Sequence, residues 1–166
     1  MERIETIRGI DIPEKVSGWV DQFIKPNDLG FMSYIQDRVD ASDIVVFSKV
    51  LFPEFFIFDD VVFLSDFVDE DMVRARFPQC KAKGKDERSF NLVKIWDLFP
   101  WGAEERSYED AGKIIAFAWD VSLRRTFPDR NFCVEYINSE QNYGPIVSFH
   151  QVFDHGKAPS ELDAGP

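Results

Sequence analysis

The chain has 166 residues, of which 45% are hydrophobic and 15% are aromatic. A single domain of this length buries about 70% of the surface that its unfolded chain exposes, and such a composition excludes a disordered or fibrous protein. Thirty acidic and nineteen basic residues give a formal net charge of -11, which opposes binding to nucleic acid and to anionic lipid.

The first predicted helix covers residues 12–25. Pro13 is compatible with a first helical turn, Pro26 ends the pattern, and Asp11 with Glu14 supplies an acidic cap. One face of this helix carries apolar residues at the spacing i, i+3, i+4, i+7 and i+8: Val16, Trp19, Val20, Phe23 and Ile24.

A second apolar segment, DIVVFSKVLF at residues 43–52, leaves two structures open. Ser42 could cap a helix here, whereas the consecutive β-branched residues Ile44, Val45 and Val46 favour a strand almost as strongly. Pro53 ends the segment in either case.

Two further apolar runs, EFFIF at 54–58 and VVFLS at 61–65, predict a β-hairpin or one long bent strand around Asp59 and Asp60. Asp-Asp is a poor two-residue turn, because both central residues of a type I′ turn need positive φ. Both faces of the strands are apolar, one with Phe55, Ile57, Val61 and Phe63 and the other with Phe56, Phe58, Val62 and Leu64. Helices over both faces are favoured, and an open apolar patch rimmed by carboxylates is the alternative.

Residues 69–77, DEDMVRARF, predict a helix with acids in its first turn and bases in its last turn. Residues 79–88 predict a polar, mostly basic loop, and residues 89–99 predict a segment that begins as a helix and is stopped by Pro100. The longest predicted helix covers residues 107–126, with Ser107 as its N-cap and Pro128 after its end. Its apolar residues spread around much of the circumference, so we expect it to lie in the centre of the core.

Strands at residues 131–137 and 145–152, joined by the turn-rich loop NSEQNYG, predict a second hairpin. Because the strands occur in antiparallel pairs and do not alternate singly with helices, we predict an α+β fold. It should contain an antiparallel sheet of two hairpins, with three to five strands, packed with about five helices that include one long central helix. Residues 1–153 should form one domain, and residues 154–166 a polar tail that frays.

Four segments resemble a family of small bacterial proteins of uncharacterised function: VLFPEFFIFDDVVFL, IWDLFP, LRRTFPDRNFCVEY and YGPIVSFHQ. The resemblance spans roughly residues 42–151 and implies no activity and no catalytic residues. Asp59-Asp60 departs from the family pattern, in which Asp-Gly is expected. In size and acidity the chain is also similar to immunity proteins of bacterial toxin systems, although no motif carries that similarity.

The sequence contains no recognisable motif for nucleophilic catalysis, nucleotide binding or metal binding, so we predict no cofactor and no metal. Cys80 is expected in a loop and Cys133 in the packing of a strand, both as reduced thiols. The two histidines and the acids near them match neither tetrahedral nor facial-triad ligand spacing: His150, His155, Asp154 and Asp163.

The first residues, MERIETIRGI, lack the apolar region of a secretory signal. No apolar run reaches the roughly 18 residues that a membrane span needs. These two features predict a cytoplasmic protein without a membrane partner.

The most unusual pattern in the chain is a concentration of acids between Val50 and Val73, with no base among them: Glu54, Asp59, Asp60, Asp66, Asp69, Glu70 and Asp71. Residues 81–94 then carry a net charge of +3. Individual ion pairs between the two segments are favoured because the short separation makes the encounter easy, yet each exposed pair contributes only about 0–1 kcal/mol. We therefore predict that the seven acids form an interaction surface for a basic protein.

The predicted function is a non-enzymatic protein-interaction domain with this acidic, aromatic-rich surface, one form of which is an immunity-type inhibitor of a basic partner. Two alternatives remain open. The first is an enzyme whose site is assembled from scattered residues, with Asp59, Asp60, Tyr143 and His150 as candidates. The second is a small structural component that forms a homodimer through the hairpin at 54–65.

Overall fold

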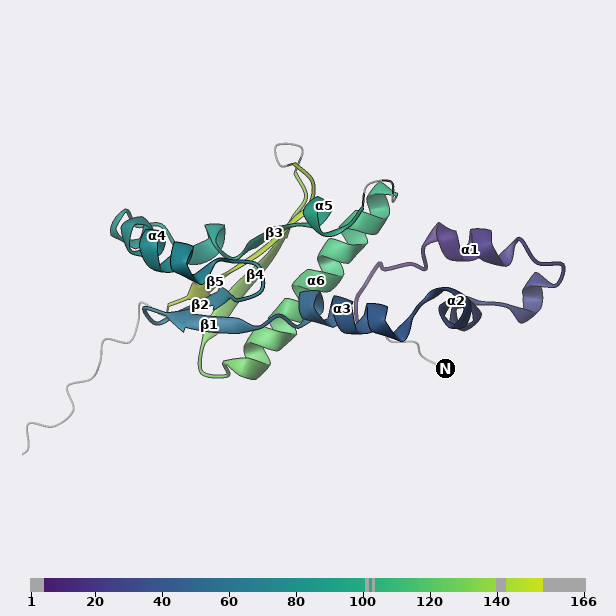
Figure 1. Cartoon of the computed structure of the whole chain (residues 1–166), viewed down its shortest axis with the longest axis horizontal. Helices are drawn as coiled ribbons and strands as arrows, with labels where there is room; N and C mark the ends of the chain where they lie inside the picture. The colour runs from purple at the N-terminus through teal and green to yellow at the C-terminus, as the bar shows by residue number, and fades with distance from the viewer. Residues whose placement is uncertain (1–4, 101, 103, 140–142, 154–166) are drawn as a thin grey trace, which may run out of the picture.

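The structure is a computed structural model that describes residues 5–100, 102, 104–139 and 143–153. In these residues the chain forms six α-helices and two antiparallel sheets, one with two strands and one with three. The predicted α+β class is therefore confirmed, with the two hairpins in separate sheets. The helices α1 and α2 lie to one side of the sheets, at the end of the molecule marked N in Figure 1. The predicted tail, residues 154–166, falls outside the described residues.

The N-terminal helices are short. Helix α1 covers only Glu14–Val20, so the predicted helix over 12–25 is wrong at both ends. Its N-cap residue is Pro13, which makes no side-chain cap hydrogen bond. A 3-10 helix η1 at Pro26–Asp28 and a helix α2 at Phe31–Arg38, which the sequence patterns do not predict, follow. Buried Trp19 joins α1 to α2, because its indole Nε1 donates to Asp37 at 3.2 Å.

The apolar segment after α2 is a helix, α3, at Ala41–Leu51. The strand alternative is therefore wrong, and so is the predicted cap, because Asp40 and not Ser42 is the N-cap residue. The Asp40 carboxylate accepts from the Ser42 backbone N–H at 2.7 Å, and hydrogen bonds from Ser42 hold the pKa of Asp40 below its usual value. Asp43 completes a capping box by accepting from the Asp40 N–H at 3.2 Å.

The first hairpin has strands β1 at Phe55–Phe58 and β2 at Val61–Leu64. Asp59 and Asp60 form its tight turn with φ of 52° and 64°, which Asp tolerates better than most side chains. This turn pairs Phe58 with Val61 directly, and residues directly opposite point to the same face. The predicted faces are therefore wrong: Phe55 and Ile57 share a face with Val62 and Leu64, and Phe56 and Phe58 with Val61 and Phe63.

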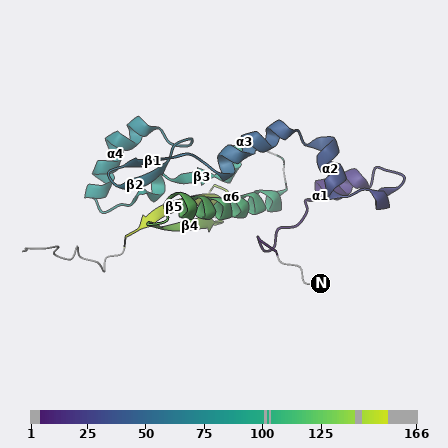
Figure 2. The ribbon, with the colours of Figure 1, turned by 90° about the horizontal axis from the view of Figure 1, so that it is seen from below.

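Both faces of β2 are covered, and all four of its residues are buried. Val62 and Leu64 belong to the main core, with Trp119 and Phe149. Phe63, on the other face, packs in a second core cluster with residues of the next helix. Figure 2 shows the hairpin between that helix, α4, and the layer that contains α6, β4 and β5. The favoured explanation, coverage of both faces, is confirmed for β2.

Helix α4 covers Glu70–Ala82 and is longer than predicted, so residues 79–82 are helical and not loop. Pro78 lies inside it. Val73 and Phe77 lie four residues apart on one face of the helix and are buried in the second core cluster. Asp69 caps it by accepting from the Met72 N–H at 2.9 Å. The chain continues through a 3-10 helix, η2, at Glu87–Ser89.

The segment at 89–99 does not begin as a helix. It forms strand β3 at Leu92–Lys94 and then one helical turn, α5, at Ile95–Leu98. Tertiary contacts explain the difference. Strand β3 pairs antiparallel with the C-terminal strand β5, Ile146–Val152, and this pairing outweighs the local preference of the segment for a helix.

Two buried polar side chains next to β3 extend the hydrogen bonding of the sheets. The Asn91 amide donates to the Val62 carbonyl at 2.9 Å and accepts from the Leu64 N–H at 3.0 Å, so it joins this segment to β2. The Glu87 carboxylate accepts from the Gln151 N–H at the far end of β5. Both residues are almost fully buried.

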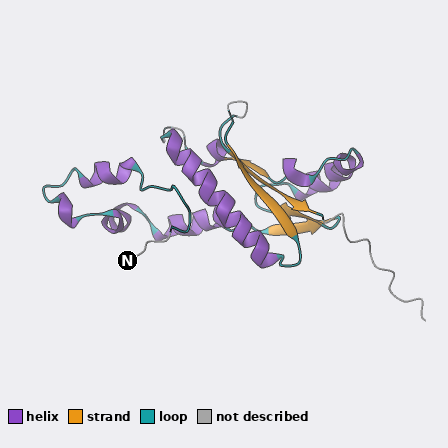
Figure 3. Cartoon of the chain, turned by 180° about the vertical axis from the view of Figure 1, so that it is seen from behind, coloured by secondary structure: helices purple, strands orange, loops and turns teal. Residues whose placement is uncertain are grey.

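The long helix α6 covers Glu105–Thr126, and strand β4 covers Asn131–Ile137. The strand order is β3-β5-β4, and α6 runs alongside these strands (Figure 3). Ile115, Trp119 and Leu123 of α6 are buried in the main core, so its predicted central position is confirmed. Its predicted N-cap is wrong, because Ser107 lies within the helix and Glu104 precedes it.

Candidate functional site

The acidic segment is largely paired within the chain. Four of its seven carboxylates form ion pairs: Glu54 with Lys49, Asp59 with Lys81 at 2.7 Å, Asp60 with Arg130 at 2.7 Å, and Glu70 with Arg74 at 3.5 Å. The Lys49 ammonium lowers the pKa of the Glu54 carboxyl, which in turn raises the pKa of Lys49. The acids of these pairs are all exposed. Each paired base cancels much of the long-range field of its carboxylate, so the segment is less negative toward a partner than its sequence suggests.

The other three predicted acids serve local structure or face solvent. The Asp66 carboxylate accepts from the Glu54 backbone N–H at 3.4 Å. Asp69 caps α4, and Asp71 lies exposed in its first turn. The segment is thus spread over the hairpin turn, the loop after β2 and the start of α4.

Helix α3 presents an unusual apolar exterior. Ile44, Val45 and Val46 are 63%, 68% and 67% exposed, and no residue of α3 is buried. A helix that is apolar around most of its circumference is normally covered by other parts of a protein. Contiguous exposed apolar patches are a common feature of interaction sites in soluble proteins.

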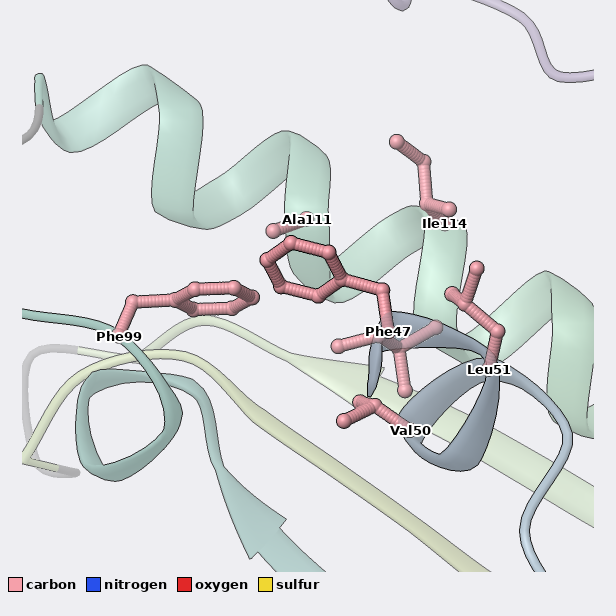
Figure 4. A pocket seen from close by; sticks show the side chains of 7 residues that line it. Phe47, Val50, Leu51, Phe99, Ala111 and Ile114 are labelled. Carbon is pink, nitrogen blue, oxygen red and sulfur yellow. The ribbon is translucent and has the colours of Figure 1, made fainter. Parts of the chain in front are cut away.

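A groove between α3 and α6 adjoins these side chains. It has a volume of about 170 Å³, and Figure 4 shows Phe47 of α3 and Phe99 reaching toward each other beneath α6. The two rings stack with their centroids 6.0 Å apart. The lining residues are all apolar: Phe47, Val50, Leu51, Phe99, Ala111, Ile114 and Ile115. Such a groove can hold an apolar group but offers nothing for acid–base chemistry.

Two stripes of apolar side chains meet at this groove. Ile44, Phe47 and Leu51 have the spacing i, i+3 and i+7 on α3, and Ile114, Phe117 and Val121 have the same spacing on α6. Phe117 and Val121 are exposed and point away from the sheet, because the sheet contacts the opposite side of α6. We define the α3–α6 surface as five residues of these stripes together with the exposed Val46 of α3: Ile44, Val46, Phe47, Ile114, Phe117 and Val121.

The residues of the enzyme alternative are not brought together. Asp60 binds Arg130, which also donates to Gln151 at 3.1 Å, near the end of β5. The Tyr143 ring packs against Trp96 before the start of β5, with the centroids 5.0 Å apart. With about 3.3 Å per residue along a strand, Tyr143 and Gln151 are separated by roughly 20 Å or more. His150 points to the opposite face of the sheet from Gln151.

A different group of side chains does converge, on the face of the three-stranded sheet opposite α6. Cys133 and Glu135 are two residues apart on β4, and His150 lies directly opposite Cys133 on β5. One ligand atom from each of the three residues lies within 4.8 Å of the others. Of the metal ligands considered from the sequence, only His150 belongs to this group, because His155, Asp154 and Asp163 lie outside the described residues.

Arg88 of η2 covers this cluster. Its Nη1 lies 3.2 Å from the Glu135 carboxylate, and its Nη2 lies 3.1 Å from both ring nitrogens of His150. The two ring lone pairs point in different directions within the ring plane, so one donor at equal distances cannot bond to both. The guanidinium therefore stacks on the face of the imidazole.

The predicted roles of the two cysteines change accordingly. Cys80 does not lie in a loop. It lies in α4 and packs against the second core cluster. Cys133 is half-buried, and its thiol lies beside the polar side chains of Glu135 and His150, so it does not serve apolar packing alone. The alternation Cys133-x-Glu135 is visible in the sequence, but the register that places His150 opposite is not, because the loop between the strands is long enough to allow several registers.

No helix of the described residues is both long enough and apolar enough to cross a membrane. No protein-family model, no curated protein and no solved structure matches the chain. The family resemblance described from the sequence stays a prediction, and the function has to be argued from the geometry of the surfaces above.

Proposed function

We propose that the protein is a non-enzymatic interaction domain that binds a basic protein through the α3–α6 surface. The observation that carries this proposal is the exposure of α3, whose apolar side chains have no cover in the described structure. Burying a large aliphatic or aromatic side chain is worth about 1.5–3 kcal/mol. A partner that covers several of them would gain enough free energy to offset the cost of association.

The charge around this surface favours a basic partner. Asp40 and Asp43 lie at the beginning of α3, and Glu54 with Asp66 lies just beyond its end. The one base within α3, Lys49, is paired with Glu54. Two of the seven predicted acids, Glu54 and Asp66, thus lie near the apolar surface. Together with Asp40 and Asp43 they support electrostatic steering of a basic protein.

A second copy of the chain is the less favourable occupant. Two molecules that each carry a net charge of -11 repel one another before contact. In the hairpin that the homodimer alternative requires, β2 is buried on both faces, so only the partly exposed β1 could contribute to such a contact. An immunity-type inhibitor of a basic target is one kind of protein that fits the proposed arrangement.

The test uses the full chain, immobilised, with host extract at about 50 mM and about 500 mM salt. Retained proteins are identified by mass spectrometry, and each basic candidate is then purified and titrated against the wild type and two double variants. Ile44→Ser/Val46→Ser changes the α3–α6 surface, whereas Ile57→Ser/Val152→Ser removes apolar side chains that are exposed elsewhere.

We expect the first double variant to lose about tenfold or more in affinity, equal to about 1.4 kcal/mol, and the control to change by less than about twofold. Association should slow as salt rises. Equal affinity of both variants and the wild type, or a partner that is itself acidic, would overturn the proposal. Sedimentation equilibrium that gives a dimer mass for the wild type and a monomer mass for the α3 variant would assign the surface to a second copy instead.

A further inference from the structure

We propose that Cys133, Glu135 and His150 form a site for a single transition-metal ion, with Zn²⁺ as the best match. All three side chains leave the sheet on the same face, because Cys133 and Glu135 alternate along β4 and Cys133 pairs with His150 in the β4–β5 register. Residues directly opposite on antiparallel strands have Cβ atoms about 4.5–5.5 Å apart. The ligands are thus held on two paired strands and not on loops.

The chemistry of the three ligands selects the metal class. Thiolate, imidazole and carboxylate together suit Zn²⁺ and related ions, whereas Mg²⁺ and Ca²⁺ take oxygen ligands. In a tetrahedral site with bonds of about 2.0–2.3 Å, neighbouring ligand atoms lie roughly 3.3–3.6 Å apart. The three ligand atoms lie within 4.8 Å of one another. Side-chain rotations that move these atoms by about 1 Å would therefore bring them to the spacing of a metal site.

Two neighbouring polar atoms provide a second, independent observation. The Ser148 side chain is only 1% exposed, and its Oγ has no hydrogen-bond partner among the described residues. Ser148 lies directly opposite Glu135, whose buried Oε2 makes no hydrogen bond, although the Arg88 guanidinium lies 3.2 Å from it. Buried polar atoms are rarely left unpaired, and carboxylates that ligate a metal are typically held by a hydrogen bond from a neighbour. Ser148 is placed to orient Glu135 in this way.

Arg88 acts as the competitor of the metal. In the described structure its guanidinium supplies the positive charge that faces Glu135 and stacks on His150. A dication would take over that role, and the two cations cannot share the cluster without strong repulsion. The Arg88 side chain is 40% exposed and already lies 3.7 Å from Asp86, so it has an alternative anionic partner in solvent.

The test is metal binding to the reduced full chain after removal of metal with a chelator. Zn²⁺ affinity is measured by competition with a chromophoric chelator, and Co²⁺ is used as a spectroscopic probe, because a thiolate ligand gives an absorption band that oxygen ligands do not. We expect one ion per chain, and a loss of about tenfold or more in affinity for Cys133→Ser and for His150→Gln. The matched control Cys80→Ser should bind as the wild type does.

The effect of Arg88→Met separates a metal site from a purely structural ion pair. Removal of the competing cation should raise the Zn²⁺ affinity about fivefold or more, whereas a structural ion pair gives no binding in either protein. Circular dichroism shows whether each variant is folded, and Glu135→Gln provides a near-isosteric third test. Absence of stoichiometric binding by the wild type, a thiolate band that survives in Cys133→Ser, or weaker binding by Arg88→Met would overturn the proposal.

Discussion

Asn91 is the residue whose removal should destabilise the fold most for its size. Its side chain is fully buried and makes two hydrogen bonds to the backbone of β2, one to the Val62 carbonyl and one from the Leu64 N–H. In Asn91→Ala both backbone groups remain buried but lose their partner. Each buried unsatisfied group costs about 1–3 kcal/mol, so the expected loss is about 2–6 kcal/mol of a total stability of about 5–15 kcal/mol.

The assay is equilibrium unfolding in urea, followed by far-UV circular dichroism, with Asn138→Ala as the control. Asn138 makes one exposed hydrogen bond, to Glu109 at 2.8 Å, and its removal should cost less than about 0.5 kcal/mol. Asn91→Asp should be no milder than Asn91→Ala, because it keeps the acceptor for Leu64 but places a carboxylate oxygen against the Val62 carbonyl. If Asn91→Ala unfolds at the same urea concentration as Asn138→Ala, the two sheets are not joined through this amide.

Three further predictions concern the packing of α6 and the C-terminal end of β5. Gly112→Ala should lower the free energy of unfolding by about 1–3 kcal/mol, measured by thermal unfolding, because the new Cβ would lie 2.6 Å from the Tyr136 ring. The control Gly18→Ala has open space around the new Cβ and should be neutral or stabilising. Burial raises the pKa of Tyr136, and the Glu109 and Asp110 carboxylates raise it further. The folded state then keeps a proton that the unfolded state loses above pH 10.0, so the free energy of unfolding should fall as pH rises beyond that value. Tyr136→Phe should remove this dependence on pH, and titrations followed by tyrosine absorbance should show the loss of the late-ionising group. Glu87→Gln keeps an acceptor for the Gln151 N–H and should retain more stability in urea than Glu87→Ala, which leaves that N–H unsatisfied; equal midpoints for the two variants would contradict this role.

Elements with a strong local signal could be predicted from the sequence. The long helix α6 combines an extended apolar pattern with a proline after its end, and both hairpins follow from paired β-rich runs around turn residues. The Asp59-Asp60 turn is tight although neither residue is glycine, because pairing along β1 and β2 offsets the cost of two positive φ values. Strand β3 could not be predicted, since three residues carry little pattern and its conformation depends on β5.

The N-terminal helices show the same limit of local reasoning. An apolar face over 12–25 predicts one long helix, yet α1 ends at Val20. Gly18 lowers the helix propensity of this short segment, and the contacts of Trp19 with Tyr34 and Asp37 of α2 depend on the tertiary fold. The exposure of Ile44 and Val46 could not be predicted either, because an apolar helix pattern normally indicates burial. The proposed function rests on that mismatch between the sequence pattern and the environment of α3.

The two proposed sites are separated by the core, so each can be tested without disturbing the other. Phe117 and Val121 lie on the side of α6 that points away from the sheet, while Trp119 and Leu123 on its other side are fully buried against it. Cys133 and His150 then lie on the far face of that sheet. For a partner that contacts only α3 and α6, any effect of Zn²⁺ on its affinity would have to pass through the packed core. Additive effects of Val46→Ser and Cys133→Ser on folding stability are the expected signature of this separation.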